Sequence, residues 1–287
     1  QAMVQNSRHQ AALSLLDQQQ QAVSRQPVLL ALRGRALIGV GQADAAREAF
    51  RQAIEQSTQM QQLQAVAEQM VSAMGDEEAI AALTAMEQGF RAPAAIELMI
   101  ASIEIGMGRP AEAVARVSKA QAMIPAESPM SGMAQRLLAI GQIEAGQNDA
   151  AIESLRVLIQ NNPTDVESLN NLAFVLSDKL GRAKEGLPYA QQASSLDPRN
   201  AEILDTLGWA QYKAGQVNEG KETLLQSARI KPTGYAAYHL GLILLEQGQS
   251  LQAREQFEAA RNLAEQGGDQ KLLKLIESQL ALPGADE

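Results

Sequence analysis

The sequence predicts an all-α fold: an α-solenoid of about seven helix–turn–helix repeats, with a partial N-terminal repeat and a C-terminal capping helix. The first observation behind this is a regular series of glycines, each placed to end a first helix. They are Gly41, Gly75, Gly108, Gly146, Gly181, Gly215 and Gly248, separated by 34, 33, 38, 35, 34 and 33 residues. A period of this length is typical of repeat architectures, because each helix pair can bury its apolar face only against its neighbours.

Two further markers keep the same period. Small residues lie five positions after most of these glycines, where the second helix of each repeat is expected. They are Ala46, Ala113, Ala151, Gly186, Gly220 and Ala253, with Ala79 four positions after its glycine. Prolines, which cannot continue a helix, close four of the repeats at Pro125, Pro163, Pro198 and Pro232.

The segment 201–233 shows the pattern most clearly. Leu204, Leu207 and Gly208 have the i, i+3, i+4 spacing of one helical face. Gly215 interrupts this pattern, and a second amphipathic run follows. A glycine inside a helix costs about 1 kcal/mol relative to alanine. We therefore expect Gly220, inside the second run, to mark a close approach of another helix.

Composition supports closely packed helices and excludes several classes of function. Hydrophobic residues make up 46% of the 287 residues but aromatic residues only 3%, so small aliphatic side chains dominate the packing. The formal net charge of −9 argues against binding to a phosphate backbone. No apolar run is long enough to span a membrane. Without cysteine, the chain can form neither a disulfide nor a thiolate zinc site.

The two ends of the chain differ from the central repeats. Residues 2–5 are expected to be the tail of a first helix, with Asn6 in the turn, so that the natural protein continues upstream. Near the other end, 269–282 is amphipathic and is expected to cap the last apolar surface. Its apolar face would carry Leu272, Leu275, Ile276 and Leu280. Residues 283–287 are expected to form a frayed tail.

This helix–turn–helix, with Leu-Gly at 207–208, a small residue in the second helix and a closing proline, resembles the tetratricopeptide repeat (TPR). The resemblance implies a right-handed superhelix. Its repeats would lie at about 27–59, 60–93, 94–127, 132–165, 166–200, 201–233 and 234–267, after a partial repeat at 1–26 and before a capping helix and tail at 268–287. The pattern departs from the family at Ser128–Ser131, an expected extra connector, and in the fifth repeat, which has one extra turn residue.

Nothing in the sequence indicates catalysis. His9 and His239 are far apart in the chain and are expected to be surface or groove-edge side chains. The glycines of 39–41 and 106–108 fall where repeat turns are due and follow no strand, so they do not form a dinucleotide-binding loop. We therefore expect no enzyme activity, no cofactor and no bound metal.

The resemblance points to a binding surface in the last three repeats. In TPR arrays the first helices line a concave groove, and four positions of each point into it. At these positions the chain carries five of its nine aromatic residues with polar neighbours, and the protein-binding prediction is Asn170, Phe174, Glu202, Asp205, Trp209, Tyr212, Tyr235 and Tyr238. Aromatic side chains flanked by polar groups are typical of binding hot spots.

Packing is the alternative for these aromatic residues. Large first-helix side chains can fill gaps between neighbouring repeats, and this applies above all to Trp209 and Tyr212. Phe50 and Phe257 lie at second-helix core positions and are expected to pack. Because Glu202 and Asp205 make the predicted groove acidic, it should repel a terminal carboxylate and accept an extended segment with apolar and basic residues.

The resulting hypothesis is a non-catalytic scaffold that binds an extended peptide or a partner protein in its groove. One alternative is a self-association module. Another is a carbohydrate-binding groove of an export system, since aromatic faces also stack on sugars. The runs at 171–173 and 204–209 are similar to those of large bacterial TPR proteins, several of which belong to the cell envelope. The resemblance therefore favours, without deciding, a periplasmic over a cytoplasmic location.

Overall fold

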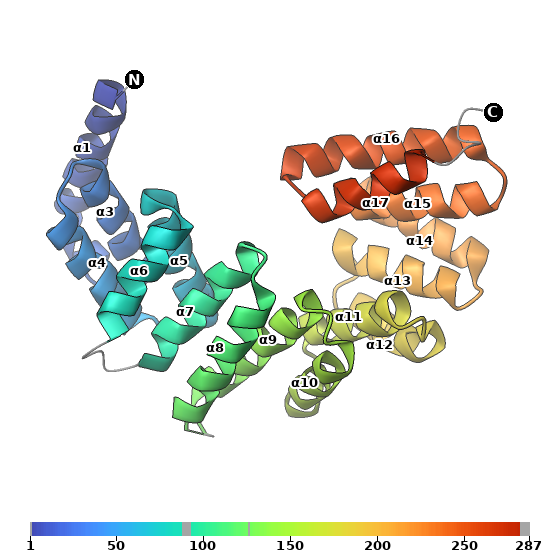
Figure 1. Ribbon diagram of the computed structural model, residues 1–287, viewed down its shortest axis with the longest axis horizontal. Helices are drawn as coiled ribbons and strands as arrows, with labels where there is room; N and C mark the ends of the chain where they lie inside the picture. The colour runs from blue at the N-terminus through green and yellow to red at the C-terminus, as the bar shows by residue number, and fades with distance from the viewer. Residues whose placement is uncertain (1, 88–92, 126, 282–287) are drawn as a thin grey trace. The chain divides into compact units, whose positions relative to one another are not determined.

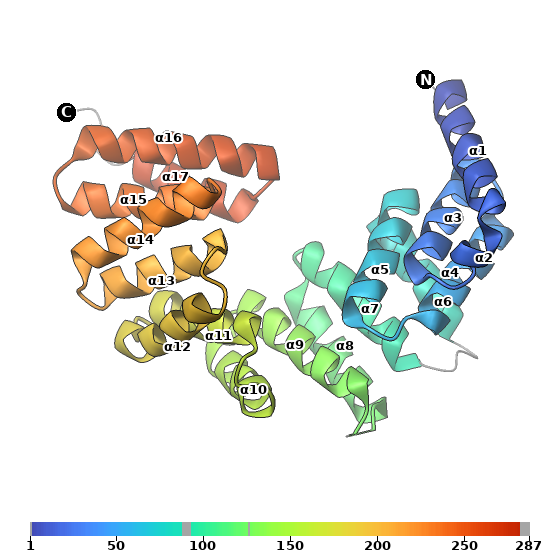
Figure 2. The same ribbon diagram turned by 180° about the vertical axis from the view of Figure 1, so that it is seen from behind.

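The computed structural model describes residues 2–87, 93–125 and 127–281, and within them the protein is built from helices alone. Seventeen α-helices and one π-helical turn follow one another, and these described residues contain no strand (Figure 1). The predicted all-α class is confirmed. The same succession of short antiparallel helices is visible from behind (Figure 2).

The chain divides into two compact units, unit 1 at Gln1–Gln147 and unit 2 at Asn148–Glu287. The helices of unit 1 are α1 (Ala2–Gln18), α2 (Gln20–Val23), α3 (Pro27–Gly39), α4 (Ala43–Gln56), α5 (Met60–Met74), α6 (Asp76–Glu87), α7 (Pro93–Gly106), α8 (Pro110–Met123) and α9 (Pro129–Glu144). Those of unit 2 are α10 (Asn148–Asn161), α11 (Val166–Phe174), the π turn η1 (Val175–Lys179), α12 (Ala183–Leu196), α13 (Ala201–Lys213), α14 (Val217–Ile230), α15 (Gly234–Glu246), α16 (Ser250–Gly267) and α17 (Gln270–Leu280).

The predicted turn glycines end the first helices as expected. All seven have a positive φ, between 65° and 94°, which residues with a side chain rarely adopt. The chain then folds back with a hydrogen bond across the turn. In the turn of Gly215, for example, the N–H of Gln216 donates to the carbonyl of Gln211 at 2.9 Å.

Small residues lie where first and second helices cross. One such contact is between Gly208 of α13 and Gly220 of α14. A Cβ atom built on Gly220 would lie 2.6 Å from the carbonyl oxygen of Gly208, and one on Gly208 would lie 2.9 Å from the carbonyl oxygen of Gly220. The prediction that Gly220 marks a close helix approach is confirmed.

The two phenylalanines expected in the core also pack against glycines of the first helices. Phe50 and Phe257 are 0% and 2% exposed, so the packing prediction is confirmed. Each ring lies against a first-helix glycine: a Cβ on Gly34 would be 2.9 Å from Phe50, and one on Gly241 would be 2.6 Å from Phe257. Where the second helix presents a large ring, the first helix therefore presents no side chain.

Two local expectations are corrected. Asn6 lies inside α1, which runs unbroken from Ala2 to Gln18, because that stretch contains neither glycine nor proline to end a helix. Ser128–Ser131 is not a connector: α9 begins at Pro129, and the hydroxyl of Ser128 accepts a hydrogen bond from the N–H of Met130 at 3.2 Å.

The C-terminal helix α17 packs onto α16 and α15 through Leu272 and Ile276, which are 1% and 0% exposed. This agrees with the expected capping helix. Leu275 was expected on the same apolar face, but its side chain is 44% exposed, so that part of the expectation is wrong. The predicted tail at 283–287 lies outside the described residues.

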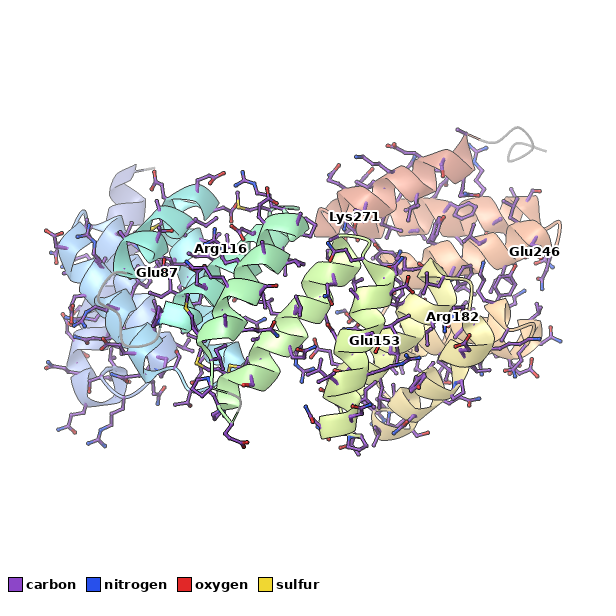
Figure 3. All side chains as sticks on the ribbon, turned by 60° about the horizontal axis from the view of Figure 1, so that its bottom comes forward. Glu87, Arg116, Glu153, Arg182, Glu246 and Lys271 are labelled. Atoms are coloured by element: carbon purple, nitrogen blue, oxygen red, sulfur yellow. The ribbon has the colours of Figure 1, made fainter. Side chains whose placement is uncertain are left out.

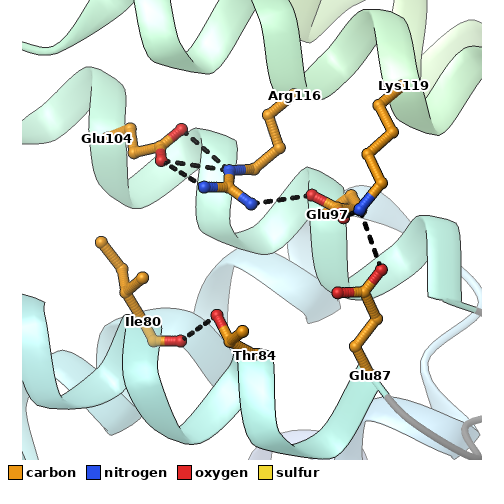
Figure 4. A network of polar contacts seen from close by, with 7 residues as sticks. All are labelled: Ile80, Thr84, Glu87, Glu97, Glu104, Arg116 and Lys119. Carbon is orange, nitrogen blue, oxygen red and sulfur yellow. Dashed lines mark hydrogen bonds and ion pairs between the residues drawn. The ribbon is translucent and has the colours of Figure 1, made fainter.

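A network of charged side chains joins α6, α7 and α8 in unit 1 (Figures 3 and 4). Glu97 of α7 is 0% exposed and accepts hydrogen bonds from Arg116, at 2.9 Å, and from Lys119. Arg116 also pairs with Glu104 at 2.8 Å, and Lys119 with Glu87 at 3.1 Å. Burial raises the pKa of Glu97, but the hydrogen bonds from Lys119 and Arg116 outweigh this and leave its pKa below the ordinary value.

Gly220→Ala should destabilise the protein, although alanine is the better helix former. The added methyl group would meet the backbone of α13, and such overpacking costs about 1–3 kcal/mol. The matched control is Gly132→Ala in α9, where a Cβ would meet nothing within 4 Å. That variant should be neutral or stabilised by up to about 1 kcal/mol. Urea unfolding of both variants measures the difference, and equal shifts of the same sign would contradict the close crossing.

Glu97→Gln should lower the free energy of unfolding by about 1.5–3 kcal/mol at neutral pH, since it weakens two charge-assisted hydrogen bonds. The carboxylate is stabilising above the pKa of an unfolded glutamate, about 4.3. This contribution is lost as the pH falls through the lower pKa of the folded state. The gap between wild type and variant should therefore close below about pH 4. The exposed Glu68→Gln should stay within about 0.5 kcal/mol of wild type throughout.

Candidate functional site

The aromatic residues that the sequence places on the first helices of unit 2 form one connected set. We call Phe174, Trp209, Tyr212, Tyr235, Tyr238 and His239 the aromatic row. They come from α11, α13 and α15, which are successive first helices. The row is held together by stacking, by the Lys179–Asp178 ion pair, by the contact of His239 with Asp205 and by one indole hydrogen bond.

Trp209 is the centre of the row. Its ring stacks on that of His239 with centroids 4.2 Å apart and planes 11° apart, and on that of Tyr212 at 5.3 Å and 27°. Tyr235 and Tyr238 are tilted against the imidazole of His239, with ring centroids 6.3 Å and 5.9 Å from it. Offset stacking at these distances is favourable for aromatic pairs. The row therefore ties α13 to α15.

The π turn η1 links α11 to the row. The fifth repeat has one residue more than its neighbours, and the structure places this residue in η1, where the N–H of Leu180 donates to the carbonyl of Val175 at 3.1 Å. The turn contains Asp178, whose Oδ1 accepts a hydrogen bond from Nε1 of Trp209 at 2.9 Å. Insertions of this kind are frequent at functional sites. The extra residue was expected in the loop, and this expectation is corrected.

Lys179 joins Phe174 to the same cluster. Its Nζ lies 2.9 Å from Oδ2 of Asp178 and 4.7 Å from the centroid of the Phe174 ring. Burial raises the pKa of Asp178, but Lys179 and the indole of Trp209 hold it below its ordinary value. Burial and the charge of Asp178 together raise the pKa of Tyr238. At neutral pH Asp178 is therefore an anion and Tyr238 a neutral phenol.

Asp205 and His239 form a buried pair. Nδ1 of His239 lies 2.8 Å from Oδ1 of Asp205, and the two residues are 5% and 8% exposed. They are separated by 34 residues, one repeat period, so they occupy equivalent positions on neighbouring first helices. His239 was expected at the surface or groove edge. That expectation is wrong, because the Asp205 carboxylate and the Trp209 ring both provide partners for a buried imidazole.

The predicted site residues differ in exposure. Trp209, Tyr238 and Asp205 are buried at 7%, 8% and 8%, which favours the packing interpretation for Trp209 and gives Asp205 an internal partner. Tyr235 is 37% exposed and Glu202 is exposed. Asn170, Phe174 and Tyr212 are partly buried. That these residues bind a protein stays a prediction, and the accessible members are the ones able to touch a partner directly.

In the part of the chain that the structure describes, no group of three or more histidine, aspartate or glutamate side chains is arranged to hold a metal ion. None of the described helices is both long enough and apolar enough to cross a membrane.

Tetratricopeptide repeat profiles match residues 28–59, 133–165 and 206–269. The chain is a tetratricopeptide repeat protein. The TPR fold supports a role as a protein-interaction scaffold, and TPR proteins are typically not enzymes.

A curated relative, a TPR repeat-containing protein of Pseudomonas aeruginosa, is 32% identical over 89 residues, which are 31% of this chain and 15% of the relative. This chain thus matches a small part of the relative's length. The association with the cell envelope stays a prediction.

Solved structures of TPR proteins share the fold. One from Parabacteroides merdae covers 86% of this chain and 97% of its own, with a TM-score of 0.62 and 16% identity. A Thermus thermophilus protein covers 65% and 98%, with a TM-score of 0.55 and 20% identity. PilW, a type IV pilus biogenesis factor, covers 67% and 96%, with a TM-score of 0.51 and 20% identity.

Asp178→Ala should destabilise the TPR protein by about 1–3 kcal/mol, because it leaves the buried indole N–H of Trp209 without an acceptor. Trp209 is the chain's only tryptophan, so its fluorescence reports on this site alone. Its emission should shift to longer wavelength as water reaches the indole. Glu255→Ala, an exposed carboxylate of α16, removes the same charge and should change neither quantity. Unchanged emission in Asp178→Ala would contradict the hydrogen bond.

Proposed function

We propose that this TPR protein is a non-catalytic scaffold that binds an extended segment of a partner protein along the first-helix face of unit 2. The observation that carries the proposal is the aromatic row, whose rings on α13 and α15 contact one another and are linked to Phe174 of α11 through Asp178 and Lys179. Protein interfaces draw most of their binding energy from a few aromatic anchors. The first helices of three consecutive repeats supply such anchors here.

The row has a buried and an accessible part, and the two parts have different roles. Trp209, Tyr238 and His239 fix the spacing of the helices. Phe174, Tyr212 and Tyr235 keep part of their surface accessible for a partner. Rings held by stacked neighbours lose little side-chain entropy on binding, which favours affinity.

Polar groups beside the row support binding of a peptide backbone. Oδ1 of Asn170 is buried and has no hydrogen-bond partner among the described residues. Asn170 lies one helical turn before Phe174, on the same face of α11. After a rotation of its side chain, the amide could pair with the backbone of a segment lying across Phe174.

The proposed site offers a partner less negative charge than the acidic groove expected from the sequence. Asp205 is engaged by His239, and Asp178 by Lys179 and Trp209. Glu202 is the exposed predicted carboxylate that remains beside the row. The preferred segment is therefore mainly apolar or aromatic, with a single basic residue opposite Glu202.

Two other functions make different predictions. A sugar site needs an aromatic face open to the ligand, and Trp209 is 7% exposed with its ring stacked on His239 and Tyr212. Quenching of Trp209 fluorescence by oligosaccharides would nevertheless support it. Self-association would appear as a molecular mass that rises with protein concentration in sedimentation equilibrium. A peptide site predicts neither result.

Tyr212→Ala together with Tyr235→Ala should abolish capture of the partner from a lysate of the native organism. Truncating a hot-spot ring costs about 2 kcal/mol or more in binding. The control is Leu225→Ala with Leu251→Ala, which removes apolar side chains that are 37% and 71% exposed on α14 and α16. The control variant should still capture the partner. Both variants should keep wild-type helical content by circular dichroism.

If the tyrosine variant unfolds, Phe174→Ala with Tyr235→Ala tests the same face. Equal capture by the wild type and a folded row variant would contradict the proposed site. Loss of capture in the leucine control alone would move the binding surface to the second helices.

A further inference from the structure

Unit 1 contains a pocket of about 670 Å³ between α1, α3 and α5. This volume lies in the range of cavities that hold a ligand or a large side chain. Its apolar lining includes Ala12, Leu16, Leu32, Ala36 and Ala73. Arg8, His9 and Arg35 also line it and supply the polar groups. The aromatic row lies in unit 2, so this pocket is a separate feature.

The helices approach closely at one wall of the pocket. The ring of His9, on α1, packs on Gly39 of α3, so closely that a Cβ at this glycine would overlap the imidazole. Gly39 ends α3 and therefore allows α1 to cross it here. The wall of the pocket is thus built by packing between two helices.

The pocket carries positive charge without a carboxylate to balance it. Nη1 of Arg35 donates to Oε1 of Gln69 at 3.1 Å, which orients the guanidinium but leaves its charge uncompensated. Within the described residues, neither Arg8 nor Arg35 has a carboxylate at ion-pair distance. Among the described residues, no aspartate or glutamate lines the pocket.

Several described arginines of unit 1, unlike these two, are paired with acids. Arg33, two residues before Arg35, pairs with Asp17 at 3.0 Å, and Arg116 pairs with Glu104 at 2.8 Å. In a chain of net charge −9, the notable feature is that two arginines without an acidic partner line the same pocket. Guanidinium groups bind carboxylates through paired hydrogen bonds.

We propose that this pocket binds an acidic, apolar segment of a partner protein. A large apolar side chain of the segment fills the space between Leu16, Leu32 and Ala73, and neighbouring aspartate or glutamate side chains pair with Arg8 and Arg35. The charge preference is opposite to that of Glu202 beside the aromatic row. The two sites therefore take different segments.

The surface next to the pocket favours a protein segment over a small molecule. Leu15 lines the pocket and is 63% exposed, so an apolar side chain stands at the edge of the pocket. A ligand confined to the cavity would leave this leucine in water. A segment that crosses from α5 to α1 would cover it.

The test uses a dye-labelled peptide in which leucine alternates with glutamate, and a second peptide in which lysine replaces each glutamate. Binding is followed by fluorescence polarisation with the full chain. The glutamate peptide should bind, and Arg8→Glu with Arg35→Glu should weaken it by about tenfold or more, because like charges then face each other. The lysine peptide should gain affinity in the same variant. Raising the salt concentration should weaken the glutamate peptide further.

Two variants complete the test. Arg25→Glu with Arg47→Glu makes the same change of charge on exposed parts of unit 1 outside the pocket and should leave the affinity near that of wild type. Ala73→Phe fills the pocket and should abolish binding without any change of charge. The proposal is overturned if the glutamate peptide fails to bind, or if it binds the Arg8/Arg35 variant as it binds wild type. Saturation of the pocket by octanoate without peptide binding would also overturn it, since the site would then be one for small carboxylates. None of these results would contradict the binding proposed for unit 2, because they concern a pocket of unit 1.

Discussion

The distance between the two helices of a repeat is set by glycines at the positions where the helices cross. At Gly208 and Gly220 the backbones of α13 and α14 meet so closely that a single methyl group would overlap a carbonyl oxygen. Gly34 and Gly241 serve the same purpose against Phe50 and Phe257. Close crossings let each helix pair present a narrow, rigid face to its neighbours. The position of every residue on the first-helix face follows from this spacing.

Regular spacing along the chain also sets which side chains meet between repeats. Asp205 and His239, like Arg35 and Gln69, are 34 residues apart and touch because equivalent positions on neighbouring first helices face each other. In unit 2 this alignment gives a chain of contacts through Trp209, and in unit 1 it orients a guanidinium at the wall of a pocket. A scaffold of nearly identical repeats can therefore carry two surfaces of different chemistry. The difference lies in a few side chains at repeated positions.

The parts of the fold that could be predicted from the sequence are those set by local geometry. Turn glycines need a positive φ, and crossing residues need small volume, so both leave a periodic pattern. Burial of His239 and of Glu97 depended on partners in other helices, although a 34-residue separation from Asp205 was a usable signal for the histidine. The presence of an extra residue in the fifth repeat could be predicted from the spacing of the turn glycines. Its place in the π turn beside Trp209 could not be known without tertiary contacts.

The central claim is that a partner contacts the accessible rings of the aromatic row while the buried rings hold the helices. Hydroxyl-radical footprinting with mass spectrometry, with and without the captured partner, measures this ring by ring. Protection of Phe174, Tyr212 and Tyr235 is expected on binding, while Trp209 and Tyr238 should react little in either state. Tyr189, on the second helix α12, should be unaffected and serves as an internal control. Protection of Tyr189 without protection of Tyr212 and Tyr235 would contradict the claim.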